Sequence, residues 1–186
     1  GNARIESQFV EVLGQSTEYA FIAPRAVAES DIVLLHEGLG SLAAWREFPQ
    51  ELASATRCRV LAYSRVGYGR SAPDPGRRAL NYLHREAAER LPALLQQLGV
   101  RRPVLVGRSD GASIALLHAA LRPGEQAGVV AMAPHVHVEP ITLRGIAAAR
   151  EAYRRGELRE RLARYHEDVD GAFSGWCEAW LAPAFR

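Results

Sequence analysis

The chain has 186 residues, of which 48% are hydrophobic, so it is long enough to bury the core of one domain. Its net charge is only +2, and arginines alternate with glutamates over residues 154–161, which predicts a solvated helix face and no nucleic-acid surface. Cys58 and Cys177 lack the spacing of a zinc site or a disulfide framework. The sequence shows no secretory signal and no apolar run that could cross a bilayer. We therefore expect a cytoplasmic protein with no metal, no nucleic-acid partner and no membrane contact.

The hydrophobic pattern alternates between short apolar runs and segments with helical spacing. It predicts strands at residues 9–12, 18–22, 32–35, 60–63, 104–106 and 129–133. It predicts helices at 42–55, which Pro49 must bend or split, at 80–98, which Gly99 closes, and from 112 onward. Strands that alternate with helices indicate an α/β fold with a mostly parallel sheet.

The last quarter of the chain has a different character. Two helices rich in arginine and glutamate are predicted from Ile141 to about Glu167, and an aromatic segment follows them. The change near Pro140 predicts two units, a core over residues 1–139 and a helical segment over residues 140–186.

The most informative motif is Gly107-Arg108-Ser109-Asp110-Gly111, a G-x-S-x-G sequence between a predicted strand and a predicted helix. Such a turn is too tight for side chains at its flanks, so glycines stand on both sides of the serine. It holds the hydroxyl clear of the backbone at the head of a helix. We therefore predict that Ser109 is a nucleophile.

A serine nucleophile also needs donors for the oxyanion that its attack creates. We predict that the backbone N–H of Asp110 is one donor. The second should come from the loop 36–41 after the strand at 32–35, and we choose the N–H of Gly38, because glycine lets main chain approach a substrate closely.

Three segments together resemble the landmarks of the α/β-hydrolase fold, in order and in spacing. They are Leu35-His36-Glu37-Gly38-Leu39-Gly40-Ser41, the run from Tyr63 to Ser71, and the Ser109 turn. The chain from about residue 30 to its end is similar to bacterial single-domain serine hydrolases of the esterase and C–C hydrolase type. This resemblance implies a Ser-Asp/Glu-His triad, an acyl-enzyme, a small ester-like or carbonyl substrate, and no metal or organic cofactor.

Members of that family continue with two more strands, whose loops carry the acid and the catalytic histidine, and this sequence lacks both strands. We therefore expect the triad Asp and His to lie outside this chain, and the chain alone to be poorly active. The strand at 129–133 would then be an unpaired sheet edge, which predicts a homo-oligomer or a completing chain at that edge.

The resident histidines have structural explanations. We expect His84 and His118 in the core, His36 as part of the oxyanion loop, and His166 in solvent. His135, His137 and Glu139 alternate, so they share one face of an extended segment; we interpret it as a strand end, although a base with its acid or two metal ligands would show the same pattern.

Asp168 and Asp170 are interpreted as loop residues. The segment after Pro140 resembles a cap over the active site. Its aromatic residues Phe173, Trp176 and Trp180 either form an apolar wall for the substrate or pack the cap onto the sheet, and Arg108 either favours an acidic substrate or points to solvent.

Two other functions are compatible with the sequence. Residues 38–43 read G-x-G-x-x-A, a Rossmann fingerprint, and Arg65 after the next strand could bind the 2′-phosphate of NADP, which would make the protein an oxidoreductase. Alternatively, the chain is a catalytically inactive protein that keeps the hydrolase pocket for binding.

Overall fold

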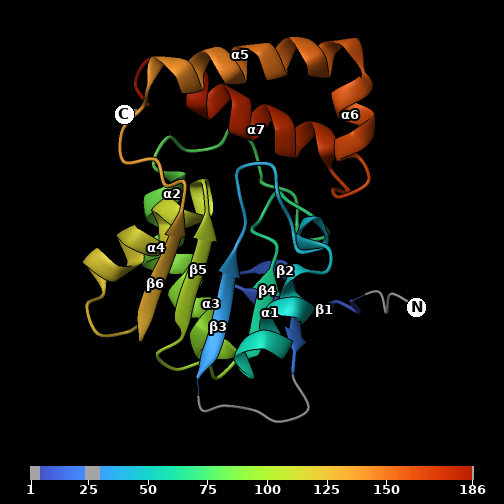
Figure 1. The fold of residues 1–186 in the computed structure, drawn as a ribbon. Helices are drawn as coiled ribbons and strands as arrows, with labels where there is room; N and C mark the ends of the chain where they lie inside the picture. Colours follow the sequence, from blue (N-terminus) through green and yellow to red (C-terminus); the bar gives the residue numbers. More distant parts are fainter. Residues whose placement is uncertain (1–4, 24–29, 186) are drawn as a thin grey trace.

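A sheet forms the centre of the molecule, with helices on both faces and a layer of helices above the carboxyl ends of its parallel strands (Figure 1). The computed structural model describes residues 5–23 and 30–185. Over these residues the sheet has six strands in the order β1-β2-β4-β3-β5-β6. Their bounds are β1 Gln8–Val12, β2 Gln15–Ile22, β3 Asp31–Leu35, β4 Arg59–Tyr63, β5 Val104–Arg108 and β6 Gly128–Met132.

The sheet is mostly parallel, as predicted. The pairs β3–β4, β3–β5 and β5–β6 are parallel, whereas β2 pairs antiparallel with both β1 and β4. Leu13 and Gly14 join β1 to β2 with φ angles of 49° and 78°, the positive values that a tight two-residue hairpin requires. In the described part of the chain β6 is an edge strand, as the sequence predicted, and Val130 on it is 48% exposed.

The helices are more divided than the sequence predicted. They are η1 Ala43–Trp45, α1 Phe48–Thr56, α2 Tyr82–Arg85, the π-helical turn η2 Glu86–Arg90, α3 Leu91–Gln97, α4 Asp110–Leu121, α5 Pro140–Arg155, α6 Glu157–Leu162 and α7 Val169–Leu181. Pro49 lies in the first turn of α1, so the segment predicted at 42–55 is split as expected. The segment predicted at 80–98 contains a π-helical turn, and Pro92 follows it in the first turn of α3.

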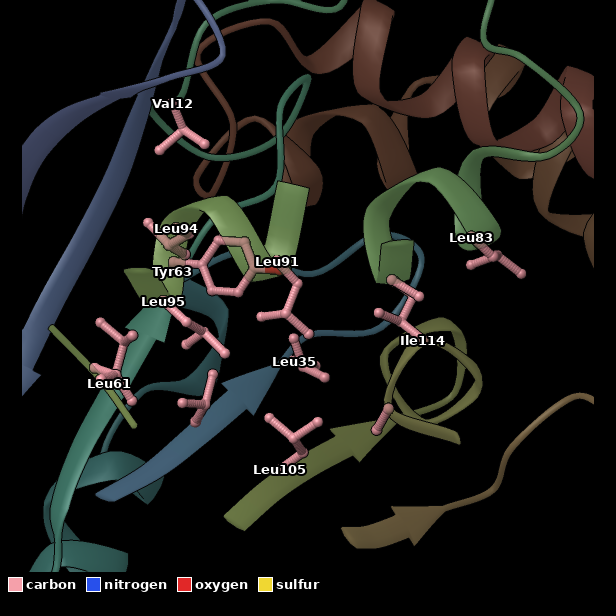
Figure 2. Close-up of a cluster of buried hydrophobic side chains, with 14 of the residues drawn as sticks. Val12, Leu35, Leu61, Tyr63, Leu83, Leu91, Leu94, Leu95, Leu105 and Ile114 are labelled. Carbon is pink, nitrogen blue, oxygen red and sulfur yellow. The ribbon is translucent and has the colours of Figure 1, made fainter. Parts of the chain in front are cut away.

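The apolar runs of the strands are buried on both faces of the sheet because successive side chains alternate between two clusters. On one face, Val33, Leu35, Leu61 and Leu105 pack against α3 and α4 through residues such as Leu91, Leu94 and Ile114 (Figure 2). On the other face the intervening residues pack against Leu42 and Ala53 of the η1–α1 segment; they are Ile32, Leu34, Val60, Ala62 and Val106.

Helices α5, α6 and α7 lie over the sheet end at which β3 and β5 finish (Figure 1). We call these three helices the cap. The aromatic segment predicted after Glu167 is itself helical, as α7, and it buries Phe173, Cys177 and Trp180 on one side. No helix in residues 5–23 and 30–185 combines the length and the apolar character needed to cross a bilayer.

Candidate active site

Ser109 is the single residue between the end of β5 and the start of α4. Its backbone has φ 52° and ψ −118°, a conformation that costs a residue with a side chain about 1–3 kcal/mol and persists only where the surroundings enforce it. Its N–H donates to the carbonyl of Met132 on β6 at 2.9 Å, and its side chain is partly exposed. The turn therefore presents the hydroxyl at the carboxyl end of the sheet, below the cap.

The two glycines of the motif are required by backbone packing. A Cβ on Gly107 would overlap the carbonyl of Gly111, and a Cβ on Gly111 would overlap the carbonyl of Leu35 at the end of β3. Both neighbours are main chain inside the fold, which cannot easily move away. The sharp turn predicted from the sequence therefore has a direct steric cause.

The predicted oxyanion loop lies beside the Ser109 turn. A Cβ built on Gly38 would lie 3.1 Å from Oδ2 of Asp110 and would overlap the indole of Trp176 in α7. Asp110 is the first residue of α4, where the backbone N–H has no acceptor within the helix. The structure thus brings Gly38, Asp110 and Trp176 together next to Ser109.

The loop backbone is fixed by two buried side chains. His36 is 2% exposed; its Nε2 accepts from the N–H of Arg65 at 3.0 Å, which leaves Nδ1 to donate to the carbonyl of Glu37 at 2.7 Å. The Arg65 guanidinium, which is also buried, donates to the carbonyls of His36 at 2.5 Å and Glu37 at 3.1 Å. Burial, followed by the charge of Arg65, lowers the pKa of His36 well below 6.5, so this ring is neutral.

The side chain of Asp110 belongs to a partly buried hydrogen-bond chain that the sequence did not reveal. The Tyr82 hydroxyl donates to Oδ2 of Asp110, and Nε1 of Trp180 donates to the Tyr82 oxygen at 3.0 Å. Burial, and then the charge of Asp110, raise the pKa of Tyr82 well above 10.0 and keep the phenol protonated. This chain ties the first turn of α4 to α2 and to the cap.

His166 is buried, so its predicted place in solvent was wrong. It is 5% exposed, its Nδ1 accepts from the N–H of Gly69 at 3.0 Å, and its Nε2 donates to the carbonyl of Leu39 at 3.0 Å. Burial lowers its pKa below 6.5. This one side chain joins the segment between α6 and α7 to the oxyanion loop and to the loop after β4.

The other predicted site residues divide into packed and exposed groups. Phe173 is 4% exposed and stacks on Tyr153 at 3.9 Å between centroids, and Trp180 is 2% exposed, whereas Trp176 is partly exposed. Arg108 is exposed, and its Nε lies 3.3 Å from a carboxylate oxygen of Glu37. Of the predicted aromatic wall, only Trp176 therefore combines partial exposure with a place beside Gly38.

In the described part of the chain, no hydrogen bond joins the side chain of His84, His118, His135 or His137 to Ser109. His118 is fully buried beside Gln126, as predicted, but His84 is exposed because Leu83 takes the buried position of α2. The ring of His135 packs edge-on against Trp180, at 4.9 Å between centroids. His137 is 72% exposed, with its Nε2 3.9 Å from Glu139.

The acidic residues of the cap have structural contacts. Asp168 caps α7 by accepting from the N–H of Gly171 at 3.0 Å. Asp170 was predicted in a loop, but it lies in the first turn of α7 and pairs with Arg159 at 2.8 Å. Over residues 5–23 and 30–185 no group of three or more His, Cys, Asp or Glu side chains is arranged to hold a metal ion.

The geometry does not support the dinucleotide-binding alternative. No long helix opens directly after Gly38-Leu39-Gly40: the short 3₁₀ turn Ala43–Trp45 comes first, and α1 begins only at Phe48. The two terminal nitrogens of Arg65 donate to the carbonyls of His36 and Glu37, so they are not free to bind a 2′-phosphate beside Gly38.

Comparison with known proteins decides the family. A model of the alpha/beta hydrolase fold matches residues 31–185. The chain belongs to the α/β-hydrolase fold family. The family assignment agrees with the resemblance stated from the three sequence segments, and with the sheet order and helix placement described above.

Among curated relatives of this α/β-hydrolase chain, a proline iminopeptidase of Lactobacillus crispatus is 30% identical over 106 residues, which are 57% of this chain and 36% of that protein. The chain thus spans little more than a third of the length of that relative. Among solved structures, a hydrolase from Pseudomonas aeruginosa superposes with a TM-score of 0.69 at 20% identity, covering 95% of this chain and 72% of that one. An enol-lactonase from Burkholderia xenovorans gives a TM-score of 0.70 at 21% identity, covering 96% and 75%.

Proposed function

We propose that this chain carries the nucleophile and the oxyanion hole of a serine hydrolase. Ser109 attacks the carbonyl of a small ester-like substrate, and the N–H groups of Asp110 and Gly38 stabilise the oxyanion that forms. The observation that carries the proposal is the backbone of Ser109, held at φ 52° between a strand and a helix, beside a loop whose glycine adjoins Asp110. Strain enforced at one residue in such a place is typical of a functional site.

The acid and the histidine of the triad belong, in this proposal, to a part of the protein outside this sequence. The chain covers 36% of its proline iminopeptidase relative and 72% of a structural neighbour, and both figures are compatible with further residues. A segment that pairs with β6 would bring them to the correct sheet edge, because β6 ends beside the Ser109 turn and Met132 already contacts Ser109 N–H.

The test is labelling of the intact protein with a fluorophosphonate probe, which reacts only with an activated serine. The wild type should be labelled at Ser109, and Ser109→Ala should lose labelling and lower hydrolysis by a factor on the order of 10³ or more. Ser174→Ala changes an exposed serine of α7 and is the matched control, which should be labelled like the wild type. An intact protein that is folded but unlabelled would instead support the non-catalytic binding function, and labelling at another serine would overturn the role proposed for Ser109.

The substrate class is tested by measuring hydrolysis with the wild type and the same variants. Three compounds are compared: a p-nitrophenyl ester, which represents the proposed substrate, and a lactone and a p-nitroanilide of proline with a free amine, which the names of two relatives suggest. The proposal names a small ester-like substrate, so we expect the p-nitrophenyl ester to be hydrolysed with the largest kcat/KM. Preference for the proline compound would assign a peptidase activity to the same Ser109.

A further inference from the structure

A hollow of about 220 Å³ lies beside the active site, between the loop that follows β4 and the α2–η2 segment. Two residues connect it with the candidate active site. Arg65 lines it and holds the oxyanion loop, and Tyr82 lines it and donates a hydrogen bond to Asp110. The lining also contains an unusual number of guanidinium groups, from Arg65, Arg77, Arg78, Arg85 and Arg90.

The carboxyl groups of the lining do not balance this positive charge. Asp74 and Glu86 are the two acids that line the hollow, and Asp74 is paired with Arg78 at 3.2 Å. Glu86 is buried and accepts from the Tyr63 hydroxyl at 2.7 Å, and its burial raises its pKa. The lining therefore holds two carboxyl groups against five guanidinium groups. The chain as a whole has a net charge of only +2, so this excess is local to the hollow.

Two of the guanidinium groups are buried and incompletely bonded. Arg78 is 6% exposed; it donates to Tyr68 and Asp74, but its Nη2 has no hydrogen-bond partner among the described residues. Arg65 is 3% exposed, and its Nε likewise lacks a partner over residues 5–23 and 30–185. A buried charged donor without an acceptor costs free energy, so neither guanidinium is fully neutralised by its protein contacts, and both residues line the hollow.

We propose that this hollow is a binding site for a small oxyanion, either a carboxylate or a phosphate group. The planar guanidinium binds both groups through paired hydrogen bonds, and the partly exposed arginines around the hollow would let such an ion enter. The bound anion would lie against Arg65 and Tyr82, the two residues that position the oxyanion loop and Asp110. The site does not depend on the chemistry proposed for Ser109.

The experiment measures binding of inorganic phosphate and of succinate to the intact protein, by calorimetry and by the thermal unfolding midpoint. Sodium chloride at matched ionic strength is the reference. We expect saturable binding of at least one of the two anions and a rise of the midpoint relative to chloride. Saturation with phosphate alone identifies a phosphoryl ligand, and saturation with succinate alone identifies a carboxylate.

The variants decide whether the hollow is responsible. Arg77→Gln with Arg85→Gln changes two exposed residues of the lining and should weaken binding at least about tenfold. Arg78→Lys keeps the charge but loses the planar fork, and should also weaken it. Arg144→Gln, an exposed change in α5 on the cap, is the control and should bind like the wild type.

The proposal fails if neither anion binds beyond the chloride reference, if the double variant binds like the wild type, or if Arg144→Gln weakens binding as much. Ser109→Ala should bind the anion normally. The proposal for Ser109 and the proposal for the hollow can therefore fail independently of each other.

Discussion

The sheet end that carries Ser109 and the cap above it are stabilised in different ways. Around Ser109, main chain lies directly against main chain: Gly111 in α4 touches the end of β3, where Leu35 is fully buried. In the cap, α5 buries only Ile146 completely, and exposed ion pairs such as Arg159–Asp170 join its helices. The first region therefore depends on the absence of side chains at its glycines, whereas the cap depends on side-chain contacts, which are exposed ion pairs and the buried aromatic residues of α7.

This difference indicates where the protein can accept substitutions without disturbing the Ser109 turn. A close-packed interior responds to the addition of one methyl group, because no neighbour can move without moving others. Exposed ion pairs contribute little to stability, since solvent screens them. We expect the cap to tolerate substitutions that the Ser109 turn does not, so variation in substrate preference is most readily located there.

Adding a methyl group to a glycine of each region should give the largest contrast. Gly111→Ala places a Cβ against the Leu35 carbonyl and should destabilise the protein by about 3 kcal/mol or more. Gly145→Ala in α5 meets no atom within 4 Å and should stabilise it by about 0.5–1 kcal/mol, through better helix propensity. Chemical denaturation of both variants measures the difference, and equal effects would contradict the contrast drawn above.

The connection between the two regions should be sensitive at His166. His166→Ala removes the hydrogen bonds to Gly69 and Leu39 and leaves a buried void, which should cost about 2–3 kcal/mol. It should also lower kcat, because the Leu39 carbonyl belongs to the loop that we propose to hold the oxyanion. Denaturation and steady-state kinetics measure the two effects, and an unchanged kcat would limit His166 to cap stability.

The same residue predicts a pH dependence. The folded protein keeps His166 neutral below the usual pKa of 6.5, whereas the unfolded chain takes up a proton there. The unfolded state therefore binds more protons as the pH falls below about 6.5, and stability should decrease in that direction. His166→Gln removes this titration and should flatten the decrease in stability between about pH 7 and pH 5. If the stability of the variant instead falls in parallel with that of the wild type, the decrease is due to His36 and His118, whose pKa values are also lowered.

The smallest effect is expected within the cap. Hydrogen bonding to Arg159 lowers the pKa of Asp170 to about 2, so the pair contributes above the unfolded value of 3.8 and is lost as the pH falls toward 2. Both side chains are largely exposed, so Asp170→Asn should change the unfolding midpoint only slightly at neutral pH, and less still in high salt. A loss of stability as large as that expected for His166→Ala would show that the ion pairs of the cap contribute more to folding than their exposure suggests.

The sequence predicted much of the sheet because the relevant signals are local. Four-residue apolar runs such as 32–35 and 60–63 become β3 and β4, and the Gly107–Gly111 pattern predicts the turn at Ser109. The division of the 80–98 helix by a π-helical turn was not predicted, since the apolar spacing is compatible with an uninterrupted helix. His166 was misplaced because its neighbours in sequence are charged, whereas its partners Leu39 and Gly69 lie about a hundred residues away.

The order of strands and helices, the glycine-flanked turn and the family resemblance were thus determined by the sequence itself, through short-range periodicity and through steric limits at single residues. The tertiary structure alone decided which distant side chains meet: Tyr82 on Asp110, Arg65 on the oxyanion loop, and the arginines that surround one hollow. These contacts depend on how the loops after different strands converge at the carboxyl end of the sheet. No local pattern in the chain encodes that convergence.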